Sequence, residues 1–320
     1  DCGEMMRPDF LNLSYLAGFM LFMNVVFSSD YASYSGGFLR MGITARSIAM
    51  GSGFTAELDQ GFTAYHNPAG ISFVTNRQAS VTNHSLQLDR NFYVASFETN
   101  LPPTAGIGFA WIRAGVNQID GRTEEGEHTG FLSTSEDAYF ISFGQQLRPW
   151  LSVGINIKLL RLQLPMNESG LVGSGMGFDL GIIIRPSPLL SIGLVIQDLN
   201  SNYLWQTSEV FAEQGRIYKE QFPVIYRIGT NYHSKRIYFV GDFGVITDYE
   251  DILGVPIRFG GEYQYKENYF FRAGYGNSRV SLGVGMKYIL FNKKDSSIDY
   301  AFVTEPALNF SHVFTVSIQF

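Results

Sequence analysis

Cysteine and charge are both scarce in this sequence. Cys2 is the single cysteine in 320 residues, and it precedes Met5 and Met6, at one of which we expect translation to begin. The rest of the chain holds no thiol, which excludes disulfide frameworks, zinc–cysteine clusters and cysteine nucleophiles there. Charged residues make up 16% of the chain, against about 25% in an average soluble domain. The net charge of −6 argues against a nucleic-acid partner, because such partners favour basic patches.

Long apolar runs are missing as well. The mean hydropathy is +0.01, and the repeated runs of about 20 apolar residues that a helical membrane protein needs are absent. Aromatic residues are abundant instead, at 15%, and there are 34 glycines. This mixture is typical of strands that have one face in lipid and one polar or small-residue face.

The first 32 residues have the pattern of a secretory signal peptide. Arg7 is followed by the apolar run 16–27 and then by the small residues of 28–32. The alternative is a single membrane anchor, but a run of about twelve apolar residues is short for a span. We therefore expect a signal peptide at 1–32, with cleavage after Ser28 or Ala32, and export to the outer membrane of a Gram-negative-type cell.

Alternating segments dominate the chain beyond residue 77. In 151–159, 257–265 and 280–288, every second residue is apolar and the residues between are polar, charged or glycine. Successive side chains of a strand point to opposite faces, so each segment has one apolar face and one polar or small face. Segments of about nine residues or more can cross the hydrocarbon layer at a tilt. The pattern predicts membrane-spanning strands.

We predict an all-β fold, a transmembrane antiparallel β-barrel of fourteen strands, an even number that places both ends on the periplasmic side. The predicted strands are 77–88, 91–100, 103–113, 137–147, 150–162, 175–185, 189–198, 222–233, 236–247, 257–265, 268–275, 279–290, 296–304 and 310–320. From residue 114 onward, long links alternate with links of two or three residues. Outer-membrane barrels likewise have long loops on the outer side and short turns on the periplasmic side. The long links are 114–136, 163–174, 199–221 and 248–256.

The last strand ends in phenylalanine. An amphipathic terminal strand of this kind looks like the signal that the barrel-assembly machinery reads, although it is also compatible with an ordinary last strand. Unpaired backbone groups are costly in lipid, so the sheet must close. Fourteen strands enclose more room than wall side chains fill, so we expect a plug or an open channel. The expected insertion signal is Phe314, Val316, Ile318 and Phe320.

The segment before the strands carries the pattern AR-x-x-AMG-x-G, then an acidic spacer, then A-x-x-NPAG. The tetrapeptide 67–70 has the composition of a turn, in which Asn bonds local backbone, Pro fixes φ and Gly accepts a positive φ. The whole segment resembles the N-terminal signature of the FadL-like barrels and of the PorV/PorQ family. The matching residues are Ala45, Arg46, Ala49, Met50, Gly51, Gly53, Ala56, Asp59, Ala64, Asn67, Pro68, Ala69 and Gly70.

The resemblance implies an N-terminal plug at 33–76 inside a barrel of 77–320. It also makes Gly51, Gly53 and the turn Asn67-Pro68-Ala69-Gly70 candidates for gating; the alternative is a tight turn without ligand contact. FadL-type members pass long-chain fatty acids and other hydrophobic compounds, and PorV/PorQ-type members are accessory to type IX secretion. The compact length fits PorV/PorQ better. We therefore predict a protein accessory to secretion or surface attachment, with outer-membrane lipid and secretion-system components as partners; the alternative is a FadL-like channel with a hydrophobic ligand.

Catalytic motifs are absent from the sequence. Five scattered histidines form no HExxH pair, no GxxxxGK[ST] occurs, and we read the glycine-rich 173–177 as a flexible loop. We expect no enzyme activity, no metal and no cofactor. The acidic stretch 120–137 reads as a solvated loop. Aromatic residues of 199–221 are candidates for contact with a ligand or partner, with interfacial girdle positions as the alternative: Tyr203, Trp205, Phe211 and Tyr218.

Overall fold

A computed structural model describes residues 34–58, 61–165, 170–208, 214–289, 295–304 and 310–320. The predicted signal peptide, Asp59 and Phe211 lie outside these residues.

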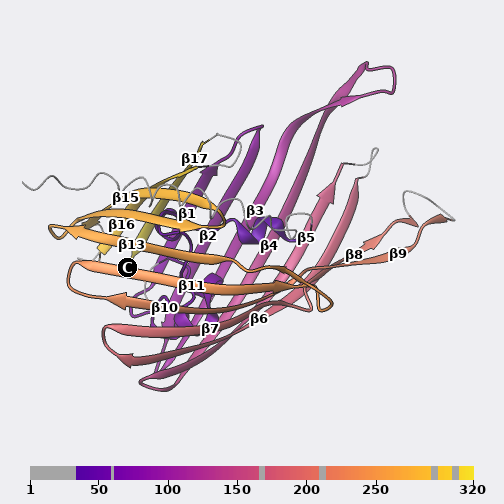
Figure 1. The fold of residues 1–320 in the computed structure, drawn as a ribbon. Helices are drawn as coiled ribbons and strands as arrows, with labels where there is room; N and C mark the ends of the chain where they lie inside the picture. Colours follow the sequence, from indigo (N-terminus) through magenta and orange to yellow (C-terminus); the bar gives the residue numbers. More distant parts are fainter. Residues whose placement is uncertain (1–33, 59–60, 166–169, 209–213, 290–294, 305–309) are drawn as a thin grey trace, which may run out of the picture.

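Fourteen antiparallel strands close into a ring (Figure 1), which confirms the predicted fold class. The sequence neighbours pair with each other, β10 follows β7 in the wall, β13 follows β11, and β17 closes the ring on β1. Each of the fourteen predicted strands overlaps one wall strand. The bounds are β1 Gln78–Ser85, β2 Arg90–Leu101, β3 Ala105–Arg122, β4 His128–Arg148, β5 Leu151–Leu164, β6 Leu171–Ser187, β7 Leu190–Leu199, β10 Val224–His233, β11 Ile237–Thr247, β13 Ile257–Tyr265, β14 Tyr269–Gly276, β15 Arg279–Ile289, β16 Asp295–Thr304 and β17 Phe310–Gln319.

Three short strands lie in the long links at one end of the ring. β8 (Asn202–Gln206) pairs with β9 (Ile217–Gln221) and with the start of β6, and β12 (Ile252–Gly254) pairs with β11. We call this the hairpin end, and the opposite end, which carries the short links and the C-terminus, the turn end.

The longest predicted loop is mostly strand. β3 has 18 residues and β4 has 21, and together they project from the hairpin end (Figure 1). The prediction of a loop at 114–136 is therefore wrong, because the ladder runs to Arg122 and resumes at His128. The sequence hides this extension: beyond the membrane both faces of the hairpin meet water, so no apolar row marks it.

The outward row of the wall is apolar, whereas the inward row of β13 and β14 carries charged residues. In β13 and β14, Phe259 is 51% exposed and Phe271 is 53% exposed, whereas Arg258 and Arg272 point inward and are buried. A soluble protein does not expose apolar side chains continuously around its circumference, so this row faces lipid. Within the described residues, no helix has the length and apolar content needed to cross a membrane.

The expected insertion signal lies in this outward row. The exposed fractions of Phe314, Val316 and Phe320 are 53%, 41% and 43%, and Ile318 is half-buried. The ring of Phe320 stacks on that of Phe97 in β2 at a centroid distance of 6.2 Å.

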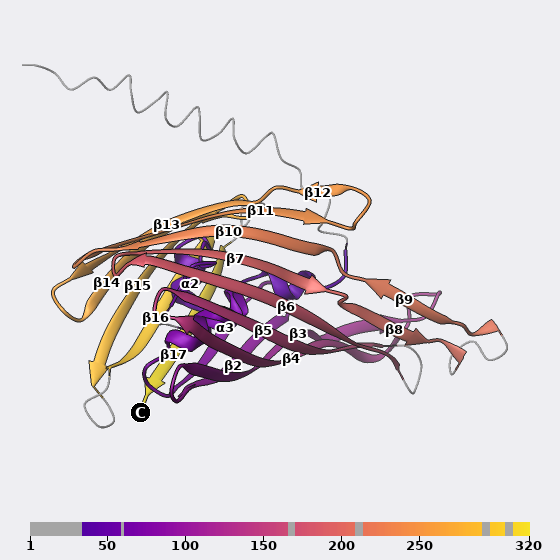
Figure 2. The ribbon, with the colours of Figure 1, turned by 90° about the horizontal axis from the view of Figure 1, so that it is seen from below.

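Residues 34–58 and 61–76 thread the interior of the ring, and we call them the plug. Figure 2 shows their short helices between the walls. The chain enters at the hairpin end, where the Tyr34 hydroxyl donates to Asp248 at 2.8 Å, and it leaves into β1 at the turn end. The plug elements are η2 Gly37–Arg40, α2 Ala45–Ala49, α3 Thr63–His66 and η3 Pro68–Phe73.

Candidate functional site

Glycines of the wall let the plug backbone lie directly against the strands. A Cβ on Gly154 would stand 2.3 Å from the carbonyl carbon of Pro68, and one on Gly274 would stand 2.3 Å from the amide nitrogen of Gly51. Only a residue without a side chain allows such an approach. The plug therefore fills the lumen wherever these glycines face it. The wall glycines that meet plug backbone or Asn67 are Gly106, Gly144, Gly154, Gly181, Gly193, Gly260, Gly274 and Gly276.

The Asn-Pro-Ala-Gly turn is bonded to the wall as well as to itself. Asn67 caps η3, because its Oδ1 accepts from the backbone N–H of Ala69 at 3.1 Å. Its side-chain amide lies within donating distance of three carbonyl oxygens, those of Thr55 (2.9 Å), Ile182 (3.1 Å) and Leu194 (3.2 Å). Two of these belong to β6 and β7. One buried side chain therefore joins the plug to two wall strands.

The glycines of the motif serve packing more than turn conformation. The expectation of a positive φ at Gly70 is wrong: residues 68–73 form a 3₁₀ helix instead, and a Cβ at Gly70 would stand 2.7 Å from the carbonyl oxygen of Glu57. Gly51 does have a positive φ, of 67°, and lies against the carbonyl oxygen of Tyr275. Gly53 faces β13 more loosely. A gating role for these residues remains a prediction.

A chain of buried ion pairs also joins the plug to the wall. Arg46 of α2 lies 3.4 Å from Glu57 and 3.1 Å from Glu262 in β13; Glu262 in turn pairs with Arg272, and Arg272 pairs with Asp299 at 2.6 Å. Every side chain in the chain is less than a tenth exposed. Burial would lower the pKa of Arg46, but Glu262 and Glu57 outweigh it and raise that pKa above its usual value. Arg46 is therefore a fixed cation inside the barrel.

In the sequence, Arg46 stands out only as part of the resemblance, and no pattern identifies its partners. The position of Glu262 is nevertheless a signal, because Glu262 interrupts the small-residue and polar row of the predicted strand 257–265. A buried carboxylate on an inward row needs a cation beside it, from a neighbouring strand or from the plug.

A second part of the lumen is apolar, contrary to the expected polar interior row. On the side of β2 to β6, side chains of the plug interlock with inward residues of the wall. The cause is the plug itself: these inward rows meet protein in place of water. We call the cluster the plug core, and its main members are Phe38, Leu39, Phe62, Tyr65 and Ile71 of the plug and Phe92, Ile112, Phe140 and Leu160 of the wall.

The aromatic candidates of 199–221 divide between this core and the surface. Tyr203 is fully buried and donates its hydroxyl hydrogen to Glu136 at 2.8 Å. Trp205 is 6% exposed and donates from Nε1 to Glu220 at 2.8 Å. Tyr218 is 62% exposed. The first two cover the plug core at the hairpin end, and only Tyr218 presents its ring to solvent; contact with a ligand or partner stays a prediction for all of them.

The glycine-rich stretch 173–177 is strand, not the expected loop. It begins β6, where Gly173 pairs with Trp205 of β8. A Cβ at Gly175 would stand 1.6 Å from the carbonyl oxygen of Asn202. These glycines therefore make room for the backbone and side chains of 201–205, where β8 begins.

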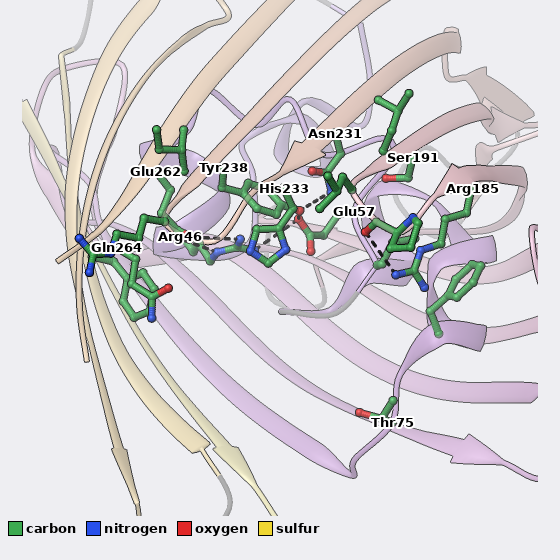
Figure 3. A pocket seen from close by; sticks show the side chains of 18 of the residues that line it. Arg46, Glu57, Thr75, Arg185, Ser191, Asn231, His233, Tyr238, Glu262 and Gln264 are labelled. Carbon is green, nitrogen blue, oxygen red and sulfur yellow. Dashed lines mark hydrogen bonds and ion pairs between the residues drawn. The ribbon is translucent and has the colours of Figure 1, made fainter. Parts of the chain in front are cut away.

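A cavity lies at the turn end, between the plug and β6, β7, β10, β11 and β13 to β15. This cavity has a volume of about 350 Å³ (Figure 3). Arg46 and Glu57 of the plug and Tyr238 and Glu262 of the wall line it. At the hairpin end a cavity of about 30 Å³ lies beside His84 and Gly51. The plug separates the two openings.

No catalytic arrangement is visible in the described part of the chain. Its residues include no group of three or more His, Cys, Asp or Glu side chains placed to hold a metal ion. His66 lies at the centre of the plug, with its ring 5.3 Å from Phe54 and 4.8 Å from Tyr65, and neither ring nitrogen has a hydrogen-bond partner. Burial lowers the pKa of His66 well below its usual value, so the ring is neutral.

Comparison with solved structures identifies barrels of the same construction. The toluene transporter TodX of Pseudomonas putida superposes with a TM-score of 0.62 at 15% identity, over 87% of this chain and 99% of TodX. The toluene transporter TbuX of Ralstonia pickettii gives 0.59 at 16% identity, over 87% and 98%. A FadL homologue of Pseudomonas aeruginosa gives 0.59 at 10% identity, over 86% and 97%.

The fold is that of the FadL-like outer-membrane barrels. The FadL-like half of the resemblance is supported, whereas the assignment to PorV/PorQ and its secretion role finds no support in these structures. Two of the compared proteins are toluene transporters. At identities of 10% to 16%, the likeness shows a shared fold. No family model and no curated protein matches the sequence.

Proposed function

We propose that this protein is an outer-membrane channel for hydrophobic small molecules. The observation that carries the proposal is the plug core. Its apolar side chains line the β2 to β6 side of the lumen from Ile71, beside Gly106, up to Trp205 at the hairpin end, and the outer row of the barrel faces lipid. An apolar compound that reaches this end finds apolar protein in place of the water that fills a general porin.

The orientation follows from the links. The long hairpins face the cell exterior, the short links and the C-terminus face the periplasm, and the barrel lies in outer-membrane lipid after insertion by the barrel-assembly machinery. The likeness to two toluene transporters and a FadL homologue supports the same substrate class. The filled lumen implies that the plug must shift locally for a molecule to pass.

Uptake by whole cells tests the proposal. The chain would be expressed in a Gram-negative host whose own FadL-type channel has been deleted, and uptake of labelled toluene and of a labelled long-chain fatty acid would be measured. We expect at least one of the two to enter several-fold faster than in cells with empty vector, while entry of sucrose is unchanged. The proposal would be refuted if both compounds entered at the rate measured with empty vector although the protein is present in the outer-membrane fraction.

A surface-proteome comparison separates this function from secretion. Deleting the gene in its natural host should leave the set of surface-attached proteins unchanged. Loss of a class of secreted proteins from the surface would instead restore the secretion role.

A further inference from the structure

The outward row of β3, β4 and β5 changes from apolar to polar at one step along the strands. One set of outward residues, paired side by side across the three strands, is Trp111, Tyr139 and Leu159. The next outward residues toward the hairpin end, paired in the same way, are Arg113, Asp137 and Arg161. Beyond them the outward residues are Gly115, Ser135 and Gln163. Because Trp and Tyr favour the boundary between hydrocarbon and water, the two arginines lie at the level of the lipid head groups.

Arg113 and Arg161 flank Asp137 in this row, and the carboxylate leaves most of their donors unused. Asp137 accepts a hydrogen bond from Trp111 Nε1 at 2.9 Å, and its side chain is only 7% exposed. The Arg113 side chain is 46% exposed, and its Nη1 lies 3.7 Å from Asp137, which is longer than a hydrogen bond. Arg161 is exposed, and its side chain makes no ion pair or hydrogen bond within the part of the chain that the structure describes. Both guanidinium groups therefore have donors left for a ligand.

The opposite side of the hairpin end has no such cations among its described residues. On β11 and β13 to β17, the outward positions nearest this end are Thr247, Ile257, Tyr275, Val280, Thr304 and Phe310. The link after β11 is acidic instead, with Asp248, Glu250 and Asp251. Long basic side chains that merely reach from the membrane edge into water could stand anywhere around the barrel. Two arginines in one row on one side indicate a specific site for an anion.

The spacing of the two arginines favours a ligand with two anionic groups. Neighbouring strands lie about 4.8 Å apart, so the backbones at Arg113 and Arg161, two strands from each other, are separated by roughly 10 Å. Asp137 stands midway and repels an anion placed between them. Each guanidinium can bind a phosphate through two parallel hydrogen bonds. The row therefore matches two separate phosphates on one molecule better than a single phosphate.

We propose that Arg113 and Arg161 bind a glycolipid of the outer leaflet that carries two phosphates, with its acyl chains against Trp111, Tyr139 and Leu159. The site uses the orientation given above, with the hairpin end at the cell exterior, and it does not depend on what passes through the lumen. The bound lipid fixes the depth of β3 to β5 in the membrane, directly below the projecting hairpin of β3 and β4.

Native mass spectrometry of the folded full chain, released from detergent micelles, tests the site. The probes are diphosphoryl lipid A and the same lipid with both phosphates removed. We expect the phosphorylated lipid to bind at least tenfold more tightly. Arg161→Gln should lose at least fivefold in affinity for it and keep its affinity for the dephosphorylated lipid. This variant leaves Asp137 with Trp111 and Arg113, so it should fold like the parent, as heat-modifiability in electrophoresis would show.

A control variant tests for a general effect of positive charge at the same end. Arg122→Gln/Arg216→Gln removes two exposed arginines, one from the end of β3 and one just before β9, and should change the affinity for diphosphoryl lipid A less than twofold. Phosphatidylglycerol, which has one phosphate, should bind at least fivefold more weakly than diphosphoryl lipid A. The site would be overturned by equal binding of lipid A with and without phosphates, by equal binding of phosphatidylglycerol, or by equal losses in Arg161→Gln and the control.

Discussion

Asn67 Oδ1 lies 2.0 Å from the point at which a Cβ on Gly181 would stand. The same side chain uses its amide to reach the carbonyl oxygen of Ile182, the next residue of β6. The Asn67 side chain can therefore bond to β6 only because residue 181 has no side chain. At this position the plug lies directly against the wall backbone, and the contact is sensitive to single atoms.

Gly181→Ala should destabilise the barrel by about 1–3 kcal/mol, because the added methyl group overlaps the Asn67 amide and one side must move. Urea-induced unfolding in lipid vesicles measures the change. Gly241→Ala is the matched control, since a Cβ there would meet its nearest neighbour, the carbonyl oxygen of Arg258, at 3.9 Å. Equal stability of the two variants would contradict the close packing at 181.

Asn67→Asp should loosen the plug. The change keeps Oδ1 but replaces the amide donor by a second oxygen, which would face the carbonyl oxygens of Thr55, Ile182 and Leu194. Each buried group left without a partner costs roughly 1–3 kcal/mol. We expect ion conductance in planar bilayers well above that of the unaltered protein. The control is Asn91→Asp, at a half-buried position near the hairpin end, which should conduct like the unaltered protein. If Asn67→Asp showed no increase in conductance, the turn would not be an anchor of the plug.

Glu262→Gln should cost about 3 kcal/mol of stability, since it removes the carboxylate that Arg46 and Arg272 share inside the barrel. The control is Asp120→Asn, which breaks exposed pairs with Arg122 and His128 on the projecting hairpin. Exposed pairs contribute little, so this variant should unfold like the parent. Similar midpoints for the two variants would show that the buried chain does not hold the plug.

The stability of the protein should fall in acid partly through His66. Its pKa in the folded protein lies below its value of about 6.5 in an unfolded chain, so below pH 6.5 the unfolded state binds a proton that the folded state does not. The contribution of His66 to the free energy of unfolding is fully present above pH 6.5. Below that pH it declines by up to about 1.4 kcal/mol per pH unit, until the pKa of His66 in the folded protein is reached. His66→Gln should flatten the loss between pH 6.5 and 5, whereas the exposed His128→Gln should not. Identical pH profiles for the parent and His66→Gln would contradict this assignment.

Phe320→Ala should slow assembly of the barrel. The residue follows β17, and its amide donates to the carbonyl oxygen of Arg77 just before β1, at the seam where the ring closes. The fraction that becomes heat-modifiable in electrophoresis, after mixing with vesicles that contain the barrel-assembly machinery, measures this step. Phe310→Ala removes an equally exposed ring from the other end of β17 and should assemble normally. If Phe320→Ala assembled at the normal rate, Phe320 would not be part of the insertion signal.

The sequence by itself determined the wall. Strands such as 257–265 alternate because lipid and lumen demand different side chains at successive positions, and this period is visible without any partner strand. It also marked the glycine-rich plug segment and the turn at 67–70, since small residues and turn formers are local signals.

Only the tertiary structure decided what the inside of the barrel is. The pairing of Arg46 with Glu262 joins residues 216 positions apart, and no local pattern gives the partner. The apolar inward residues of β2 to β6, the strand extensions of 114–136 and the cavity at the turn end likewise depend on which segments meet across the lumen. Side-chain direction is a property of one strand, whereas the contents of an enclosed space depend on every strand that surrounds it.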